Sequence, residues 1–250
     1  MKKISIVGAG PGAVDLLTQR AIQRLKEADV LVWTDSLISP QIIDLSPSYC
    51  EKIPTSSLTL EDILPILIKN CKEHKKVVRL HDGDPCLYGA LSEQINGIKD
   101  AGLETEVIPG ISAYQATAAK LKTELTVPGI TQTIVLSRAG GRTNMPEKER
   151  LESLASTGAS ICLYLSARHV IDVEKTLLKF YPEDTPVAIG YRVSWDDEWL
   201  EVVPLNQMAA KSNEKKLIRT TIYIISPALS RNQNRSKLYS SNHKHLFRPS

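Results

Sequence analysis

Short apolar runs alternate along this chain with longer segments in which apolar residues recur every three or four positions. Runs of about four to eight apolar residues are typical of buried strands, whereas the wider spacing indicates amphipathic helices. The alternation of the two patterns predicts an α/β architecture. Strands are expected at residues 4–7, 30–33, 77–80, 105–108, 133–137, 160–165, 187–191, 200–203 and 219–225. Helices are expected after Thr18, over residues 61–74, up to Ile98, and over residues 113–121, 147–155 and 170–180.

The pattern restarts after a cluster of proline and glycine at residues 125–129, which makes this cluster a candidate domain boundary. A chain of 250 residues can form one large or two modest domains, and the restart favours two. We therefore expect an N-terminal α/β domain over residues 1–120 and a C-terminal α/β domain over residues 121–229. Residues 230–250 have the composition of a basic, polar tail.

Composition and charge narrow the class of protein. Apolar residues (42%) and charged residues (24%) occur in ordinary globular proportions. No apolar run approaches the ~20 residues of a membrane span, and no signal peptide is evident, so a cytoplasmic protein without a membrane partner is expected. The four cysteines lack metal-binding spacing, which predicts reduced thiols and no metal site. The tail holds five basic residues and no acid, so the rest of the chain is slightly acidic and a nucleic-acid partner is disfavoured.

The stretch Arg79–Gln94 (RLHDGDPCLYGALSEQ) combines a strand end, an acidic loop with glycine, and a helix start. Gly83 permits close backbone approach, and Pro85 ends the strand. Phosphate loops use backbone N–H groups and usually a lysine, so Asp82 and Asp84 argue against a phosphate ligand. The two aspartates suit a ligand with amines, hydroxyls or positive charge. Alternatively, they only cap the strand-to-helix turn.

A second glycine-rich segment, residues 8–13 (GAGPGA), follows the first strand and approaches the GxGxxA pattern of dinucleotide-binding folds. Asp35 lies about 20 residues further on, where such folds place an acid for the ribose. However, Pro11 removes a backbone donor, and the best helix start is delayed to Thr18. The other interpretation is a tight turn that lets a large ligand approach the sheet edge.

Five motifs in a fixed order suggest a family. They are VGAGPG at 7–12, ADVLVWTDSLIS at 28–39, HDGDPCLYGALSEQ at 81–94, EVIPGISAYQATAA at 106–119 and ELTVPGITQTIVLSRAGGRT at 124–143. Together they resemble the S-adenosylmethionine-dependent tetrapyrrole methylases, and within that family the enzymes that methylate C11 of precorrin-4 or cobalt-precorrin-4 in cobalamin biosynthesis. The resemblance implies two α/β domains with an interdomain cleft that holds S-adenosylmethionine, an anionic tetrapyrrole substrate and a homodimer.

The resemblance also implies which residues bind the cofactor. They are Asp82, Gly83 and Asp84 along its methionine part, Ser112 and Ala113 closing over it, and Leu165 and Ala188 at the adenosine. Two of these positions have an ordinary structural alternative. Ser112 could instead be the N-cap of the following helix, and Leu165 could be a core leucine.

Methyl transfer requires the protein to hold the nucleophile and the methyl group in line, without a covalent intermediate or a metal. By resemblance, Asp35 is the candidate base for a substrate proton, with an Asx turn as its alternative role. His81 is the rival base, since small effects move a histidine pKa across neutrality. The carboxylates of the substrate require arginines, and the candidates are Arg138, Arg142 and Arg192.

Three alternatives to this function stay open at the level of sequence. One is another methyltransferase of the same superfamily that acts on a different substrate. A second is an NAD-dependent oxidoreductase built on the glycine-rich turn at residue 8. The third is a noncatalytic binding or assembly protein that acts through the basic tail.

Overall fold

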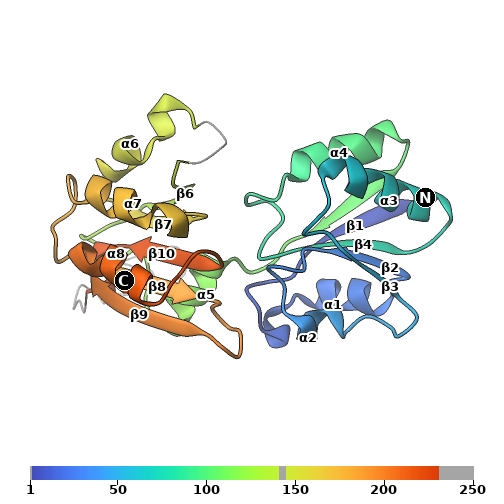
Figure 1. Cartoon of the computed structure of the whole chain (residues 1–250), viewed down its shortest axis with the longest axis horizontal. Helices are drawn as coiled ribbons and strands as arrows, with labels where there is room; N and C mark the ends of the chain where they lie inside the picture. Colours follow the sequence, from blue (N-terminus) through green and yellow to red (C-terminus); the bar gives the residue numbers. More distant parts are fainter. Residues whose placement is uncertain (1, 141–144, 231–250) are drawn as a thin grey trace, which may run out of the picture. The chain divides into compact units, whose positions relative to one another are not determined.

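The computed structural model describes residues 2–140 and 145–230. Within these ranges the chain forms two compact units (Figure 1). The first unit comprises the chain up to Ala116 together with Arg192–Glu198, and the second comprises Thr117–Tyr191 and the chain from Trp199 onward. The division falls inside helix α5 (Ala113–Lys120). No helix in the described ranges is long and apolar enough to cross a membrane.

The first unit is built on a parallel sheet of five strands. In spatial order the strands are β3 (Glu51–Pro54), β2 (Val30–Trp33), β4 (Val77–His81), β1 (Lys3–Gly8) and β5 (Glu104–Ile108). Parallel neighbours need crossover connections, and helices provide them. These helices are α1 (Gln19–Lys26), α2 (Pro40–Ile43), α3 (Leu60–Lys72) and α4 (Leu91–Asp100). Since all the strands run the same way, the loops that follow them gather at one edge of the sheet.

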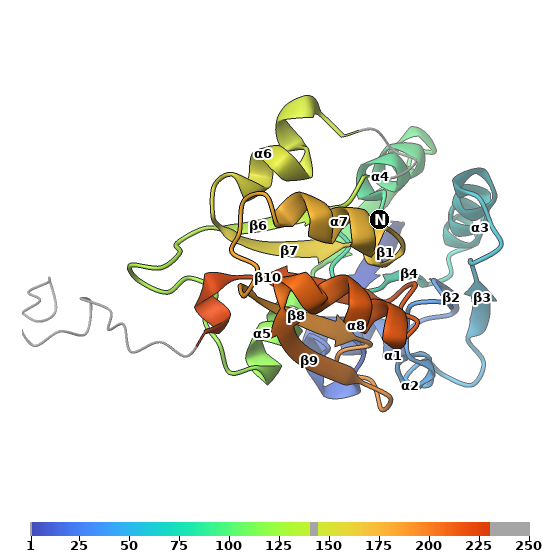
Figure 2. The same ribbon diagram turned by 60° about the vertical axis from the view of Figure 1, so that its left-hand side comes forward.

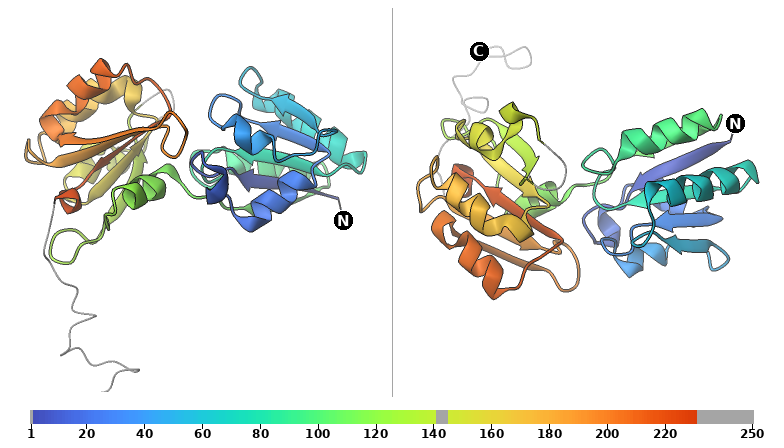
Figure 3. Two further views of the ribbon diagram at one scale, coloured as in Figure 1. Left: turned by 90° about the horizontal axis from the view of Figure 1, so that it is seen from below. Right: turned by 45° about the horizontal axis from the view of Figure 1, so that its top comes forward.

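Helices cover both faces of this sheet, as the two views in Figure 3 show. Helices α1 and α2 pack with Leu31 and Leu80 in one apolar cluster, while α3 and α4 pack with Val32 in another. The neighbours Leu31 and Val32 belong to different clusters because successive side chains of a strand point to opposite faces. Helix α1 begins after Thr18, whose hydroxyl accepts a hydrogen bond from the Ala21 N–H at 3.1 Å. The predicted N-cap is therefore confirmed.

The second unit contains a mixed sheet of five strands. In spatial order they are β6 (Ile134–Arg138), β7 (Ser160–Tyr164), β10 (Thr221–Ile225), β8 (Pro186–Tyr191) and β9 (Trp199–Pro204). Only β6 and β7 pair in parallel; the other pairs are antiparallel. One face packs against α6 (Leu151–Ala155), α7 (Val170–Leu177) and α8 (Met208–Glu214) (Figure 2). On the other face, the Ser160 hydroxyl donates to the Leu125 carbonyl at 2.8 Å.

The predicted fold of two consecutive α/β domains is confirmed. The short elements β3, α2 and α8 were not predicted. Strand β3 lies at the sheet edge with mostly exposed side chains, so it lacks the apolar run that marks a buried strand. The helix expected over residues 147–155 divides into a 3-10 turn, Glu147–Glu149, and α6, because Arg150 between them has extended backbone.

Candidate functional site

Three loops of the first unit meet where β1, β4 and β5 end, because these strands are neighbours in the sheet. The contact is made by backbone. The Ala9 N–H donates to the His81 carbonyl at 2.7 Å. Gly10 and Gly83 form a pair of backbone hydrogen bonds of 3.1 and 2.9 Å. The glycine-rich turn and the acidic loop, far apart in the sequence, are therefore joined directly.

Glycine is required at this meeting point for reasons of space. A Cβ atom on Gly8 would lie 2.6 Å from the Gly110 nitrogen and 2.7 Å from the Gly83 oxygen. A Cβ on Gly110 would lie 2.0 Å from the same Gly83 oxygen. Gly10 and Gly83 also have left-handed backbone, with φ of 68° and 56°. The glycines thus have a packing role, and α1 starts only after a 3-10 turn and Thr18, unlike a dinucleotide loop that runs straight into its helix.

The two aspartates of the acidic loop have different surroundings. Asp84 is occupied by backbone: its Oδ1 accepts from the Cys86 N–H at 2.7 Å and its Oδ2 from the Gly110 N–H at 3.2 Å. Asp82 keeps exposed surface, and no other residue of the described ranges donates a hydrogen bond to its carboxylate. Desolvation raises the pKa of Asp82, and the charge of Arg79 acts in the opposite direction. Asp82 is therefore the carboxylate available to a ligand.

Ser112 and Ala113 end the third loop and start α5. Ser112 is buried, its N–H donates to Gln115 Oε1 at 2.9 Å, and its carbonyl accepts from the Gln115 N–H at 3.1 Å. Ser112 therefore occupies the start of the helix, as its alternative interpretation expected. It also lies beside the acidic loop, because a Cβ on Gly83 would be 3.9 Å from Ser112 Cα. The structure thus brings together all five predicted cofactor residues of the first unit.

The two candidate bases are held by hydrogen bonds. Asp35, after β2, accepts from the Ser56 N–H at 2.8 Å and from the Ser56 hydroxyl at 2.7 Å. The Ser56 hydroxyl is the main reason why the pKa of Asp35 is lowered. His81 is buried, and burial followed by the charge of Arg79 lowers its pKa to about 4. His81 is accordingly neutral at pH 7 but enclosed, whereas Asp35 is ionised and partly exposed.

The predicted residues of the second unit are placed as follows. Leu165 directly follows β7, has left-handed backbone with φ of 52°, and is 67% exposed. Both features are unusual for a leucine, and a core role is excluded. Ala188 lies within β8 and exposes no surface. Arg138 is the last residue of β6 and is partly exposed, and Arg142 lies outside the described residues.

Arg192 belongs to the first unit through the segment Arg192–Glu198. Its guanidinium pairs with Asp197 at 2.5 Å and stacks on Trp195, 4.8 Å from the ring centre. Trp195 in turn packs on the glycine-rich turn: its Nε1 donates to the Pro11 carbonyl at 3.0 Å, and a Cβ on Gly12 would lie 2.2 Å from its ring. Sequence reasoning missed this contact, since nothing local links residues so far apart.

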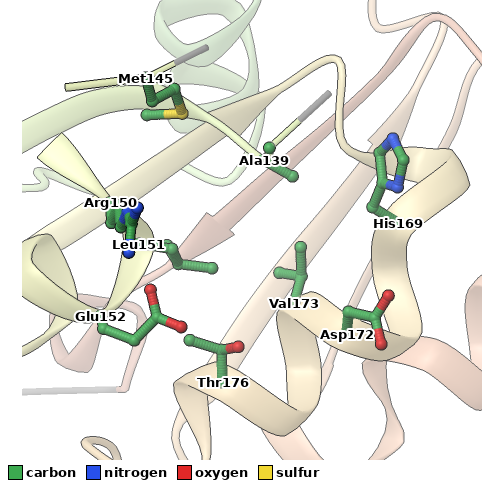
Figure 4. Close-up of a pocket in the computed structure, with 10 residues that line it drawn as sticks. Ala139, Met145, Arg150, Leu151, Glu152, His169, Asp172, Val173 and Thr176 are labelled. Atoms are coloured by element: carbon green, nitrogen blue, oxygen red, sulfur yellow. The ribbon is translucent and has the colours of Figure 1, made fainter. Parts of the chain in front are cut away.

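A cavity of about 640 Å³ lies in the second unit between the residues after β6 and helices α6 and α7 (Figure 4). Arg150 and Glu152 approach it from the α6 side, and His169, Asp172 and Thr176 from the α7 side. The described residues that line the cavity include both basic and acidic side chains, and none of them is a predicted cofactor residue. The cavity therefore adds no support to the cofactor site.

The comparisons with known proteins agree with the motifs. The sequence profile of the tetrapyrrole (corrin/porphyrin) methylases matches residues 3–209. The cobalt-precorrin-4 C(11)-methyltransferase of Methanocaldococcus jannaschii is 38% identical over 100% of this chain and 97% of the relative. The precorrin-4 C(11)-methyltransferase of Pseudomonas aeruginosa is 34% identical over 98% of both chains. The X-ray structure of a cobalt precorrin-4 methyltransferase is 35% identical, with a TM-score of 0.89 over 92% of this chain and 97% of that one. The chain therefore belongs to the tetrapyrrole methylases, the family that its motifs predicted.

Proposed function

We propose that this protein is an S-adenosylmethionine-dependent C-methyltransferase that methylates C11 of precorrin-4 or cobalt-precorrin-4 in cobalamin biosynthesis. The observation that carries the proposal is the match to C11-methyltransferases over nearly the whole length of both chains. Because the match spans both units, it covers the cofactor loops as well as the second sheet. The similarity to a uroporphyrin-III C-methyltransferase, 23% identical with a TM-score of 0.76, is a likeness of fold alone.

The loops of the first unit fit the methionine part of S-adenosylmethionine. When bound, this cofactor supplies a methyl group on a positively charged sulfur. Asp82 offers a carboxylate that accepts no hydrogen bond from any other described residue, which suits the amino group of the methionine part. Gly83 permits close approach of the ligand to the backbone, and Asp84 acts by holding the loop. Ser112 and Ala113 are proposed to bound the site from the third loop.

For the adenosine part we keep Leu165 and Ala188 as proposed contacts. An exposed leucine in left-handed backbone offers apolar surface of the kind that an adenine ring requires. Ala188 is the weaker candidate, because contact with its side chain would require movement of the groups that cover it. Both residues lie in the second unit and are proposed on the family resemblance.

Arginines are proposed to bind the carboxylates of the tetrapyrrole. Arg138 is the last residue of β6 and is partly exposed, which supports its choice. Arg192 is also partly exposed, but a substrate carboxylate would have to compete with its partner Asp197. Arg142 is proposed on the resemblance, since it lies outside the described residues. Arginine suits this task because its planar donors match a carboxylate.

Asp35 remains the proposed base. Its lowered pKa keeps it ionised at neutral pH, so it is able to accept a proton, although a low pKa makes it a weak base. The two hydrogen bonds from Ser56 fix both carboxylate oxygens and so orient the group. His81 is disfavoured because its ring is enclosed and bonded to Gln94.

We also propose a cytoplasmic homodimer. The four cysteines are free thiols, which fits a reducing compartment. Strand β9 is an edge strand with one exposed apolar side chain, Val202 (43%), and the unpaired backbone groups of an edge strand are able to pair with another chain. Light scattering of the purified protein tests this state, and a mass of one chain at micromolar concentration would contradict it.

The function is tested with methyl-labelled S-adenosylmethionine and each form of the precursor, with and without cobalt. We expect one form to receive the label, and carbon NMR should place it at C11. Transfer to another carbon would indicate a different enzyme of the family. Binding of NAD without binding of S-adenosylhomocysteine would instead support the oxidoreductase alternative.

A further inference from the structure

Three polar side chains are buried beneath the acidic loop. Arg79 and His81 on β4 and Gln94 on α4 are 6%, 5% and 3% exposed. Residues two apart on a strand share a face, and Arg79 and His81 therefore both point to the same side of the sheet. Burying a polar group costs free energy unless the group forms a hydrogen bond. The hydrogen-bond partners of these three side chains therefore indicate which parts of the loop they stabilise.

Gln94 is the centre of this group. Its Nε2 donates to the carbonyls of Gly89 at 2.9 Å and Ala90 at 3.3 Å, which fixes the orientation of the amide. Its Oε1 is then the acceptor for Arg79 Nε and His81 Nε2, each at 3.3 Å. Both polar atoms of the Gln94 amide therefore have partners: the nitrogen donates to two backbone carbonyls, and the oxygen accepts from two side chains.

The carbonyls that Gln94 holds belong to a strained turn. Tyr88 and Ala90 have left-handed backbone with φ of 57° and 47°, although neither is glycine. Between them, Gly89 is so close to the acidic loop that a Cβ would lie 2.7 Å from the Pro85 carbonyl. Such backbone persists only when its surroundings impose it. Gln94 supplies two of the bonds that do so.

The other half of the amide holds the charge beneath Asp82. Besides Gln94, Arg79 donates to the Val32 carbonyl at 3.3 Å and lies 3.4 Å from the Thr55 hydroxyl. These bonds keep the guanidinium inside the unit, where its charge opposes the rise that desolvation causes in the pKa of Asp82. A carboxylate that must bind an ammonium group needs the ionised form.

We propose that Gln94 is a positioning residue for cofactor binding, which holds the turn Tyr88–Ala90 with its donors and fixes Arg79 and His81 under Asp82 with its acceptor. The proposal rests on the proposed function, since it assumes that the acidic loop binds S-adenosylmethionine. Gln94 itself is buried and has no role as a ligand contact.

Gln94→Glu removes the donor bonds of Gln94 and keeps its acceptor bonds. A carboxylate is able to accept from Arg79 and His81, but it cannot donate to the carbonyls of the turn. We expect its dissociation constant for S-adenosylhomocysteine, measured by calorimetry, to rise about tenfold or more. The KM for S-adenosylmethionine should rise with it, while kcat at saturating cofactor and the KM for the tetrapyrrole stay within about twofold of the wild type. Gln94→Met, which removes both kinds of bond, should show a larger loss of affinity.

Asn70→Asp is the matched control. Asn70 is a buried amide on α3 that also donates to a backbone carbonyl, that of Ile66, and accepts from a cation, Lys75. Its partners lie in its own helix and in the segment that follows it, and neither belongs to the acidic loop, so its variant should bind S-adenosylhomocysteine normally. Wild-type affinity in Gln94→Glu would overturn the proposal, as would failure of both Gln94 variants to fold while the control folds. Absence of binding in the wild type would instead contradict the proposed function.

Discussion

At the scale of the residue, the two aspartates of the acidic loop, Asp82 and Asp84, differ in their hydrogen-bond partners. The sequence assigned Asp82 and Asp84 to the same ligand, because composition does not reveal which carboxylate the backbone occupies. The structure gives Asp84 two N–H donors, one from the loop and one from Gly110, whereas no other described residue donates a hydrogen bond to the Asp82 carboxylate. We infer that Asp82 acts on the ligand and Asp84 on the loop.

Asp82→Asn and Asp84→Asn should therefore differ. In Asp82→Asn the carboxylate for the ammonium is lost, so the dissociation constant for S-adenosylhomocysteine should rise at least about tenfold with little change in melting temperature. In Asp84→Asn an acceptor for a backbone N–H is lost, so stability should fall by about 1 kcal/mol, or about 3 °C in melting temperature. Calorimetry and thermal unfolding check both. Equal melting temperatures with equal losses of affinity would refute the division of tasks.

Glu106 offers a second test at this scale, away from the site. It accepts two hydrogen bonds from Arg24, at 2.9 and 3.0 Å, and pairs with Lys3 at 3.2 Å. Arg24 is the main cause that lowers the pKa of Glu106 from 4.5 to about 2. A lowered folded-state pKa stabilises the protein above the unfolded pKa, and this contribution is lost as the pH falls from about 4.5 toward 2.

Glu106→Gln should accordingly lower the free energy of unfolding at pH 7 by about 1–2 kcal/mol, allowing for solvent screening. The difference from the wild type should shrink when urea unfolding is repeated near pH 3. Glu104→Gln, an exposed position on the same strand, is the control and should change stability by less than about 0.5 kcal/mol. A difference that stays constant with pH would show that the ion pair is not its cause.

At the scale of the element, the strands and helices of the first unit were predictable because apolar spacing is local information. The meeting of the loops was not. Gly8, Gly83 and Gly110 are far apart in the chain, and their common role follows only once β4, β1 and β5 are neighbours in the sheet. For the same reason, two interpretations of the glycine-rich segment at residues 8–13 were compatible with the sequence: a dinucleotide-binding loop and a tight turn.

Gly110→Ala tests this packing. The new methyl group would overlap the Gly83 carbonyl, so we expect a loss of stability of about 2 kcal/mol or more and weaker binding of S-adenosylhomocysteine. Gly140→Ala is the control, because a Cβ there would meet no atom of residues 2–140 or 145–230 within 4 Å. Thermal unfolding of the two variants gives the comparison. A stable Gly110→Ala with normal binding would mean that the loops are able to separate without consequence.

At the scale of the whole molecule, the first unit is not one continuous stretch of the chain. The sequence predicted two consecutive domains, and the two sheets follow that order. Yet Arg192–Glu198, which connects β8 to β9, belongs to the first unit. The apolar periodicity of the sequence does not predict this assignment, because it depends on contacts between residues that are far apart in the chain. Trp195 Nε1 donates to the Pro11 carbonyl, and the Ser194 hydroxyl accepts from the Ala13 N–H at 3.0 Å.

The first unit should therefore depend on a segment that lies beyond residue 120. Trp195→Ala removes a ring that packs on Gly12 and donates to the Pro11 carbonyl, and should lower the free energy of unfolding by about 2 kcal/mol. Tyr49→Ala is the matched control, since Tyr49 is an aromatic residue of the same unit that is 71% exposed and should contribute less than about 0.5 kcal/mol. Urea unfolding of the full chain compares the two. If Trp195→Ala is as stable as Tyr49→Ala, the segment rests on the first unit without stabilising it, and a fragment of residues 1–120 should then be as stable as the first unit of the intact protein.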